Sequence, residues 1–403
     1  MIKILWADDQ TDVVNTFSSI LAPLSAKTIY VGDGNEAVKK LKTEHFDILL
    51  LDLKMPPEEW GGLWALEEIR KFNQKIPVII LSGEGTQNET IKALRLGAQD
   101  YVTKDKVQTD LLQRVEMVLR DSDKKIVDDL TNHFPTLISL PYKRYLNTQE
   151  PTTRLHRLLE FFEAYLRFSC IVGICEIQKN ELLNTESEKF KSLIQQPPSM
   201  GLWNQSRFFL AKNLSRDSIF AQLHTSIDND FAQSLVNIRN DIAHGAEPSE
   251  ALAAQYLKQS EGNLNDFAKK IWQNLDVELV LPTKFQFDGK KIEVDGVFIL
   301  GSNNVLPKTS FSTSAPLISN QPYLAKKSSN VWVNLFPFIV LEPSTEPAAW
   351  KIMVFDGLKM DRNTKNINGE ENLRYIDILS GQRNFTPMSK PVSKMLPNFM
   401  TDL

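Results

Sequence analysis

The chain has 403 residues, which is long for one domain and favours two or three. Hydrophobic residues make up 42% of it and the formal net charge is −4, so no global positive charge attracts nucleic acid or an anionic membrane. Its first residues, MIKILWADD, form neither a signal peptide nor an anchor, and no apolar run approaches the roughly 18 residues of a membrane span. We therefore expect a globular, multidomain protein that does not enter a membrane.

The two cysteines of the chain, Cys170 and Cys175, lie together in the apolar segment FSCIVGICEI. Because more than one helical turn separates them, they suit buried core thiols better than a disulfide or a metal pair. Unpaired thiols are typical of a reducing compartment, so we expect a cytoplasmic protein.

Short apolar runs alternate with helix-like segments along the first 120 residues. The apolar runs are IKILWA, KTIYV, FDILLLDL, IPVIILS and QDYVTK. Five strands, each followed by a helix, predict a parallel sheet covered on both faces. The near-continuous apolar runs ILLL and VIIL predict that the third and fourth strands lie in its interior.

Polar residues follow the ends of four of these strands. They are Asp8 and Asp9 after the first strand, Asp52 at the end of the third, Ser82 after the fourth and Lys104 after the fifth. Open α/β sheets bind ligands beyond the carboxyl ends of their strands, so these side chains should share one rim. Three converging carboxylates repel one another unless a cation joins them, and Mg²⁺ prefers such oxygen ligands. One carboxylate could then attack phosphorus and become an aspartyl phosphate, with the lysine and the hydroxyl holding phosphate oxygens.

The same residues resemble the motifs of response-regulator receiver domains. The matching features are the acidic pair, the D-x-x-M-P run from Asp52 to Pro56, the serine after the fourth strand and the segment GAQDYVTK, in the order and spacing of that family. The resemblance implies a flavodoxin-like fold for residues 1–120. It also implies a partner, a sensor histidine kinase or phosphotransfer protein, that phosphorylates this domain.

The resemblance further implies how the acidic residues would divide their roles. Asp52 would accept the phosphoryl group and bind Mg²⁺. Asp9 would bind the ion directly, Asp8 mostly through water, and the backbone carbonyl of Lys54 would supply a further oxygen.

Three more positions match the part of a receiver that responds to phosphorylation. Ser82 would bond the phosphoryl group, Lys104 would pair with it, and Tyr101 would be the aromatic switch residue that turns inward. Two features depart from the family. Asp105 replaces the usual proline after the lysine, which puts a cis bond there in doubt, and the insert PPEEWGG after Asp52 could alter access to the acceptor.

Residues 121–150 form the predicted connection to the rest of the chain. Scattered prolines argue against one long helix that leaves the receiver-like part. We predict a linker of short helical pieces that is packed through four apolar side chains: Phe134, Leu137, Ile138 and Tyr142.

Residues 151–275 have helical patterning. RLHRLLEFFEAYLRFSCIVGICEIQ is apolar on most faces and predicts a long, buried helix. After a break at IQQPPSMGLWNQ, further helical segments follow, and Gly245 should end one helix before Pro248 and Ser249 open the next. The region therefore predicts an α-helical bundle of about four or five helices.

Arg239, Asn240 and His244 lie near the end of one of these predicted helices. Arg239 and His244 are five residues apart, which separates them by roughly 140° around a regular helix. The run R-N-x-x-A-H-G resembles the R-x4-H motif of HEPN domains, all-α modules common in prokaryotic defence and toxin systems. In ribonuclease members, the resemblance implies that His244 acts through the RNA 2′-hydroxyl and Arg239 stabilises the phosphorane, with Asn240 as a polar companion. Such sites generally form between two protomers, which implies a homodimer.

The charge of the helical region leaves a second interpretation of this motif open. Residues 151–272 hold 13 Lys and Arg against 14 Asp and Glu and show no basic stripe, so the sequence does not support RNA binding. Arg239 and His244 could instead satisfy helix-end carbonyls or brace a dimer interface. His156 and His224 have no partner at metal spacing and are predicted to be structural. Trp203 is predicted to fill the core of the bundle.

Residues 276–390 change to a pattern of period two and predict a small antiparallel β-rich domain, with a tail at 391–403. FDGKK and FDGLK are typical of hairpin turns, and GSNNVLPKTSFSTSAPLISNQ predicts a long loop. An L-x-P-F strand before strands that end in Y-x4-S-G resembles an arrangement behind HEPN-like helices in some bacterial signalling and defence proteins. No histidine follows His244, so Ser380 cannot take part in Ser-His hydrolysis within this domain.

The sequence as a whole favours a response regulator of a phosphorelay. Phosphorylation of Asp52 would switch the HEPN-like and β-rich output region through protein contacts, in bacterial stress or phage defence. The alternative is a phosphorylation-gated HEPN ribonuclease that uses Arg239 and His244, so whether the protein is an enzyme beyond its own phosphotransfer stays open. A DNA-binding transcription factor is disfavoured, because the output region has no helix-turn-helix with a basic recognition helix.

Overall fold

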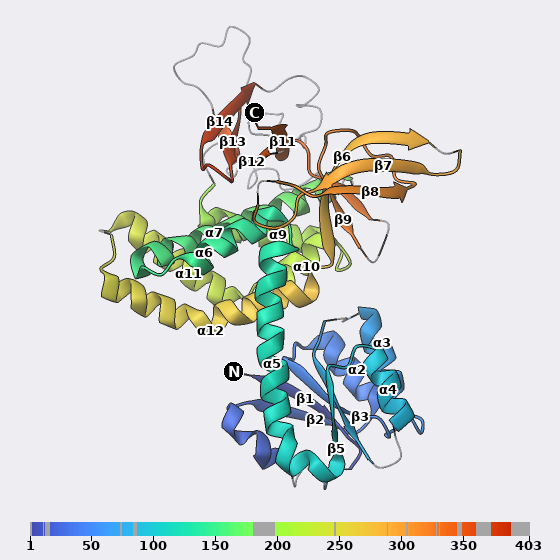
Figure 1. Cartoon of the computed structure of the whole chain (residues 1–403). Coiled ribbons are helices and arrows are strands. Elements are labelled where there is room, and N and C mark those ends of the chain that lie inside the picture. Colours follow the sequence, from blue (N-terminus) through green and yellow to red (C-terminus); the bar gives the residue numbers. More distant parts are fainter. Residues whose placement is uncertain are drawn as a thin grey trace. The chain divides into compact units, whose positions relative to one another are not determined.

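The computed structural model describes most of the chain. The described residues are 2–10, 12, 17–72, 75–83, 87–179, 198–245, 247–287, 289–303, 305–327, 329, 331–344, 349–359 and 372–387. They fall into two compact units, Met1–Asp128 with Ala268–Asn274, and Asp129–Phe267 with Leu275–Leu403. Two long helices, α5 (Val107–Asn132) and α12 (Glu250–Asn274), have residues in both units (Figure 1).

The first unit is built on a five-stranded parallel sheet in the order β2-β1-β3-β4-β5. Its strands are β1 (Lys3–Ala7), β2 (Lys27–Val31), β3 (Ile48–Asp52), β4 (Val78–Ser82) and β5 (Asp100–Thr103). Every residue of β3 is buried, as expected for an apolar strand that is covered on both faces. The predicted five-stranded parallel sheet is therefore confirmed, with β3 and β4 in its interior.

Helices cover both faces of this sheet. They are α2 (Gly34–Thr43), α3 (Gly61–Phe72), α4 (Gln87–Arg95) and α5, with the 3-10 helices η1 (Ser18–Leu24) and η2 (Lys104–Lys106). Alternate strand residues feed two cores: Leu49 lies in the one that includes α2 and α3, and Leu50 in the one that includes α5. The predicted helix after the first strand would cover TDVVNTFSSIL, residues 11–21; its described end forms η1, while residues 11 and 13–16 lie outside the described residues.

Helix α5 continues for 26 residues, to Asn132, so the prediction that no long helix leaves the receiver-like part is wrong. The prolines on which that prediction depended lie beyond its end. Pro135 precedes α6 (Thr136–Asn147), and Pro141 lies within α6. The predicted packing of this stretch is confirmed, because all four named apolar side chains, from Phe134 to Tyr142, are less than 10% exposed.

The helical part of the second unit surrounds one long helix. Its members after α6 are α7 (Pro151–Lys179), α9 (Met200–Asn213), α10 (Ile219–Thr225), α11 (Asn229–His244) and the first part of α12. Phe162 of α7 contacts Phe231 and Phe267 edge-on, with ring centroids 5.6 and 5.5 Å apart. The buried long helix is therefore confirmed, as are the buried free thiols of α7 and the burial of Trp203.

The β-rich part of the second unit contains two antiparallel sheets. One has the order β10-β9-β6-β7-β8 and the other β11-β12-β13-β14 (Figure 1). Their strands are β6 (Val277–Phe287), β7 (Ile292–Phe298), β8 (Lys308–Thr313), β9 (Tyr323–Lys326), β10 (Trp332–Asn334), β11 (Ile339–Pro343), β12 (Trp350–Lys359), β13 (Asn372–Asp377) and β14 (Arg383–Pro387). The antiparallel prediction holds, although it did not separate two sheets.

Two local predictions in this part are wrong. FDGLK is not a hairpin turn, because β12 continues through it; Gly357 has φ +108° and the register of β12 against β13 shifts between Phe355 and Leu358. The glycine therefore accommodates a β-bulge. The predicted loop 301–321 contains strand β8. The Ser and Thr residues of this strand are polar, and a loop was predicted for that reason. The FDGKK hairpin is confirmed, since Phe287 pairs with Ile292, and the tail 391–403 lies outside the described residues.

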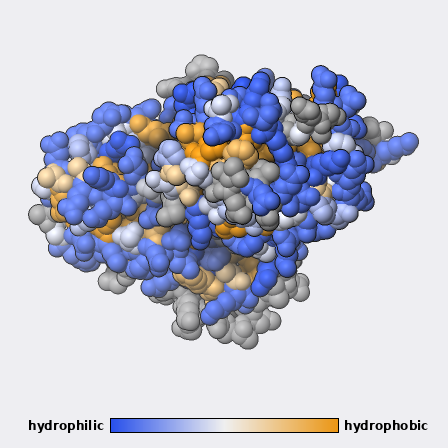
Figure 2. All heavy atoms as spheres, turned by 90° about the horizontal axis from the view of Figure 1, so that it is seen from below, coloured by the Kyte–Doolittle hydropathy of each residue, from blue (hydrophilic) through white to orange (hydrophobic). Residues whose placement is uncertain are grey.

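No helix among the described residues is both long and apolar enough to span a bilayer. The long helix α7 has a mixed surface and buries its aromatic side chains against other helices. On the face of the molecule in Figure 2, hydrophilic side chains form most of the surface and hydrophobic ones gather in separate patches.

Candidate functional site

The carboxyl ends of β1, β3 and β5, which lie at one edge of the sheet, bring Asp8, Asp52 and Lys104 together. The Lys104 Nζ lies 3.0 Å from Asp52 Oδ2 and 3.2 Å from Asp8 Oδ2. Asp8 follows β1, Asp52 ends β3 and Lys104 follows β5, and each of the two carboxylate residues is only 2% exposed. The topology therefore places a lysine between two buried acids at the rim that strand order predicts.

Asp9 completes an acidic cluster with the other two aspartates. Each of Asp8, Asp9 and Asp52 offers one carboxylate oxygen, and these oxygens lie within 4.8 Å of one another. Oxygen ligands of one Mg²⁺ ion are about 3 to 4 Å apart, so small side-chain movements would let all three bind one ion. Asp8 Oδ2 is buried and accepts no hydrogen bond, although the Lys104 ammonium is near it. The donor set and this unsatisfied oxygen fit a divalent cation.

Burial controls the electrostatics of Asp52. Loss of water contact raises the pKa of Asp52 to about 6; Lys104 opposes this rise and Asp8 adds to it. The Lys54 N–H donates to Asp52 Oδ1 at 3.3 Å. Burial by itself lowers the pKa of Lys104, but Asp52 and Asp8 raise it, and the net change is upward. The site thus holds a firmly charged lysine beside a carboxyl group that accepts a proton readily.

Two consecutive glycines let the backbone close tightly behind Asp52. The Gly62 N–H donates to the Leu53 carbonyl at 3.2 Å, and a Cβ atom at Gly62 would lie 1.8 Å from the Asp52 carbonyl oxygen. Gly61 donates to the Met55 carbonyl at 3.0 Å. The insert PPEEWGG therefore ends in residues that turn the chain directly from the acceptor loop into α3.

Ser82 and Tyr101 lie next to the acidic rim by register. In the sheet, Asp52 pairs with Leu81, and Ser82 pairs with Thr103. The side chain of Ser82 lies outside the described residues. Tyr101 of β5 is 46% exposed, so the structure shows it in an outward position.

The missing proline after Lys104 does not displace the lysine. Lys104–Lys106 forms η2, and the cis peptide bonds of the described residues are Pro56–Pro57 and Phe336–Pro337, so Lys104–Asp105 is trans. Asp105 is exposed, and a hydrogen bond to Thr103 lowers its pKa. Lys104 reaches both buried carboxylates with a trans bond.

The structure does not gather the residues of the R-x4-H motif in one pocket. Arg239 lines a pocket of about 250 Å³ between α7 and α11. The other lining residues are His156, Leu159, Glu160, Glu163, Ile242 and Ala243. Asn240 and His244 are exposed and are not among the lining residues. Glu160 pairs with Arg157 at 2.6 Å and Glu163 with Arg167 at 3.2 Å, so the pocket contains acidic groups beside its arginine.

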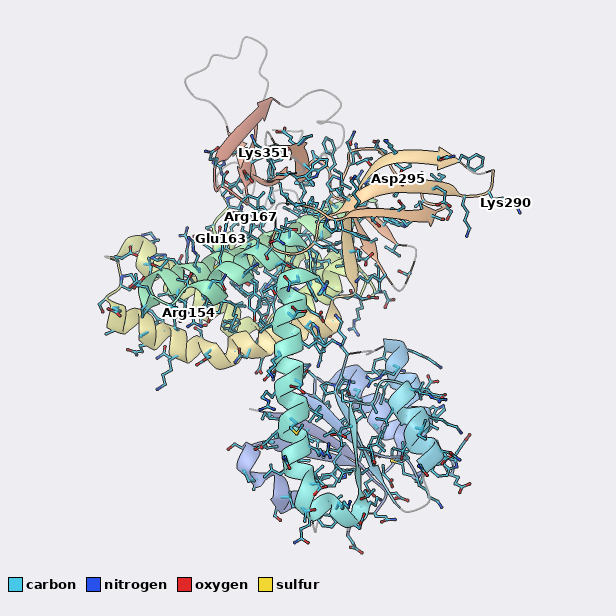
Figure 3. The ribbon with its side chains drawn as sticks, viewed as in Figure 1. Arg154, Glu163, Arg167, Lys290, Asp295 and Lys351 are labelled. Atoms are coloured by element: carbon cyan, nitrogen blue, oxygen red, sulfur yellow. The ribbon has the colours of Figure 1, made fainter. Side chains whose placement is uncertain are left out.

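A buried ion network next to this pocket escaped the sequence analysis. Arg167 of α7, which pairs with the pocket residue Glu163 (Figure 3), lies 3.4 Å from Asp356 of β12. Arg374 of β13 lies 3.1 Å from the other oxygen of Asp356. No sequence signal points to it, because its members are ordinary charged residues far apart in the chain.

The remaining histidines of the helical part have local partners. His156 pairs with Glu247, which follows the end of α11. His224 stacks on Phe220 at 5.5 Å between ring centroids. Burial, with a smaller effect of Arg207, lowers the pKa of His224 to about 4. These contacts agree with the structural roles predicted for both histidines.

Comparison with known proteins identifies the N-terminal part. Residues 4–116 match the family described as the response regulator receiver domain. The alkaline phosphatase synthesis transcriptional regulatory protein PhoP of Bacillus subtilis is 31% identical over 121 residues, which are 30% of this chain and 50% of that protein. The transcriptional regulatory protein CpxR of Escherichia coli K12 is 33% identical over 122 residues, 30% of this chain and 51% of that protein. The chain thus spans about half the length of these curated relatives.

Among solved structures, the receiver domain of the Francisella response regulator 1452 has 30% sequence identity and a TM-score of 0.28, and it covers 30% of this chain and 99% of that chain. The matched family region ends at residue 116, within α5. By the family match, the N-terminal part of this chain, with its parallel sheet and its aspartate rim, is a receiver domain of two-component response regulators.

Proposed function

We propose that the protein is a response regulator that accepts a phosphoryl group on Asp52 from a histidine kinase or a phosphotransfer protein. The observation that supports this most is the position of Lys104, which contacts the buried carboxylates of Asp8 and Asp52 in a part of the chain that matches receivers. Asp52 ends β3, the central strand of the sheet, and has Lys104 already at hydrogen-bond distance.

In the proposed transfer, a carboxylate oxygen of Asp52 attacks the phosphorus atom of a phosphohistidine. A P–O bond forms, the P–N bond breaks, and the leaving imidazole takes a proton from solvent. Lys104 would exchange its contact with Asp52 for a phosphoryl oxygen, since its ammonium is already at the rim. Ser82 would bond another phosphoryl oxygen, and Tyr101 would turn inward from its exposed position.

Asp8, Asp9 and Asp52 would hold Mg²⁺, together with the Lys54 carbonyl. The bound ion would neutralise the acidic rim and the phosphoryl oxygens. Asp8 Oδ2 supports this assignment, because it is buried and accepts no hydrogen bond from the protein. Binding of one shared ion would thus account for the short distances between the three aspartates.

The output would act through protein contacts made by the helical and β-rich parts of the second unit. A role in bacterial stress or phage defence is supported only by the resemblance of residues 151–275 to HEPN modules. The phosphorylation-gated ribonuclease has less support, because Arg239 shares its pocket with Glu160 and Glu163 while His244 lies outside it. A homodimer likewise stays a prediction.

Intact-mass analysis tests the acceptor directly. The full-length protein, incubated with Mg²⁺ and acetyl phosphate, should gain one phosphoryl group of about 80 Da. Asp52→Asn should gain none, whereas Asp217→Asn, a matched change at an exposed aspartate, should behave as the wild type. An equal adduct in Asp52→Asn would show that another residue is the acceptor.

A further inference from the structure

The last turns of α12 belong to the receiver unit. Helix α12 runs from Glu250 to Asn274, and its final seven residues, Ala268–Asn274, group with Met1–Asp128. They contact residues that lie within three positions before a strand: Phe46 and Asp47 before β3, and Lys75 before β4. Because the strands are parallel, this edge of the sheet is the one opposite the phosphorylation rim.

Asp47 is the centre of the contact. It is 7% exposed, and both its carboxylate oxygens have partners. Lys269 of α12 donates to Oδ1 at 2.9 Å, and the Lys3 backbone N–H donates to Oδ2 at 2.8 Å. The Lys269 ammonium also lies 3.5 Å from Asp123 of α5. One lysine of α12 thus joins the start of β3 to the helix that leads out of the receiver.

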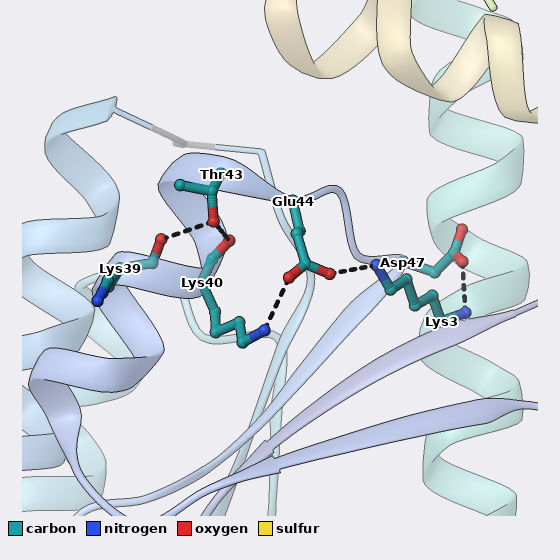
Figure 4. A network of polar contacts seen from close by, with 6 residues as sticks. All are labelled: Lys3, Lys39, Lys40, Thr43, Glu44 and Asp47. Carbon is teal, nitrogen blue, oxygen red and sulfur yellow. Dashed lines mark hydrogen bonds and ion pairs between the residues drawn. The ribbon is translucent and has the colours of Figure 1, made fainter.

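The receiver edge that surrounds Asp47 is itself held by ion pairs. Glu44 lies 2.7 Å from the Lys3 ammonium and 2.8 Å from that of Lys40 (Figure 4). Hydrogen bonds from Lys3 and then Lys40 lower the pKa of Glu44 to about 2. Lys3 therefore fixes Asp47 through its backbone and Glu44 through its side chain, which presents Asp47 in a defined position.

A second group of contacts lies one turn further along α12. The Lys75 ammonium donates to the Trp272 carbonyl and lies 5.4 Å from the centre of its ring. Trp272 is 2% exposed, and the Gln273 side chain donates to the Phe46 carbonyl at 3.5 Å. A cation at a helix C-terminus is favourable, because the last carbonyls have no partner in the helix. The end of α12 is thus held by the charge of Lys75, by the buried ring of Trp272 and by the Trp272 carbonyl, which accepts a hydrogen bond from Lys75.

Breaking the ion pair between Lys269 and Asp47 is energetically unfavourable. Burial lowers the pKa of Lys269, but Asp47 and then Asp123 raise it, and the net change is upward. Lys269 therefore stays charged, and its removal would leave the buried Asp47 carboxylate with one partner fewer.

The other end of α12 begins beside the R-x4-H motif. Gly245 ends α11, Ser249 precedes α12, and between them Glu247 pairs with His156, a residue of the pocket that Arg239 lines. As an unbroken helix of 25 residues, α12 is about 37 Å long. Helix α12 therefore begins shortly after the residue that pairs with His156, and its last seven residues belong to the receiver unit.

We propose that the end of α12 is a second, non-covalent attachment of the output region to the receiver, anchored by Lys269 on Asp47, and that α12 transmits the state of the receiver to the pocket lined by Arg239. With the end of α12 attached, two helices of the receiver unit, α5 and α12, continue into the second unit. The transmission rests on the proposed phosphorylation of Asp52, whereas the attachment does not.

Hydrogen exchange of the full-length protein tests the attachment. In Lys269→Ala, the amides of residues 268–274 should exchange about tenfold faster, since a hydrogen bond to a charged group contributes at least one factor of ten. Lys270→Ala is the matched control, because the neighbouring Lys270 has no ion pair among the described contacts. Asp47→Asn changes the other member of the ion pair and should also speed the exchange of residues 268–274. It replaces Lys269→Ala in this test if Lys269→Ala does not fold. Wild-type exchange in both Lys269→Ala and Asp47→Asn would overturn the proposal.

The same measurement with Mg²⁺ and acetyl phosphate tests transmission. In the wild type and in Lys270→Ala, phosphorylation should change exchange at residues 239–250; in Lys269→Ala this response should be lost while the adduct on Asp52 still forms. A phosphorylated wild type with no response at 239–250, or an undiminished response in Lys269→Ala, would refute transmission. Absence of any adduct would instead count against the proposed function, and the attachment would still be judged from exchange without phosphodonor.

Discussion

Burial of Asp52 makes its ionised form unfavourable in the folded protein when no cation is bound. Its pKa is raised to about 6 from an ordinary value of 3.8, mainly by burial, so the folded state favours the protonated carboxyl group. A raised carboxyl pKa stabilises the folded state below pH 3.8, and this contribution is lost as pH rises through 6. Above pH 6 the ionised Asp52 therefore destabilises the fold until a cation joins the rim.

Asp52→Asn should accordingly stabilise the protein when Mg²⁺ is absent. Near pH 7.5 the gain should be on the order of 1–3 kcal/mol, since each pKa unit corresponds to about 1.4 kcal/mol. Near pH 5 it should shrink, because the wild-type carboxyl is then mostly protonated. Urea unfolding in EDTA at the two pH values measures the difference. A variant less stable than the wild type at pH 7.5 would contradict this account of the site.

At the scale of elements, the turn from β3 into α3 determines the position of the Asp52 backbone. Gly62 approaches the Asp52 carbonyl so closely that any side chain would collide with the backbone of Asp52 and Leu53. The sequence analysis noted the insert but not this consequence, because a glycine pair alone does not reveal what lies beside it. The contact appears only once α3 packs beneath the sheet.

Gly62→Ala should therefore destabilise the receiver by roughly 1–3 kcal/mol, the cost of overpacking a tight interior. It should also reduce the acetyl phosphate adduct, since the Asp52 backbone must shift. Gly32→Ala is the matched control, because a Cβ atom there meets nothing within 4 Å. Urea unfolding and intact mass provide the two readouts, and equal effects of both substitutions would argue against a specific close approach.

At the scale of the whole molecule, the described residues of the helical part do not bring Arg239 and His244 into one pocket. Arg239 faces a pocket with two glutamates, and His244 is exposed outside it. A phosphate group that reached Arg239 would also meet Glu160 and Glu163, which disfavours a polyanion. These features disfavour the binding of RNA phosphates in the pocket that Arg239 lines.

Single-stranded RNA incubated with the purified full-length protein should thus stay intact, with or without acetyl phosphate. Gel analysis of the RNA after incubation measures this, with His244→Ala in parallel. Cleavage that requires both phosphorylation and His244 would instead establish the ribonuclease alternative.

The sequence by itself determined the receiver and its rim. The order of strands and the residue types at their ends predict where Asp8, Asp52 and Lys104 meet, because parallel strands place all their carboxyl ends at one edge. Helix α7 and most β-strands were also predictable, since their apolar periodicity is a local property of the chain.

Tertiary structure alone decided the contacts between distant segments. Lys269 and Asp47 are 222 residues apart, and neither stands out in its own segment. The bulge at Gly357 and the ion network around Asp356 are of the same kind. Each depends on which surfaces meet when the chain folds. A local sequence pattern does not indicate which distant residue will be the partner.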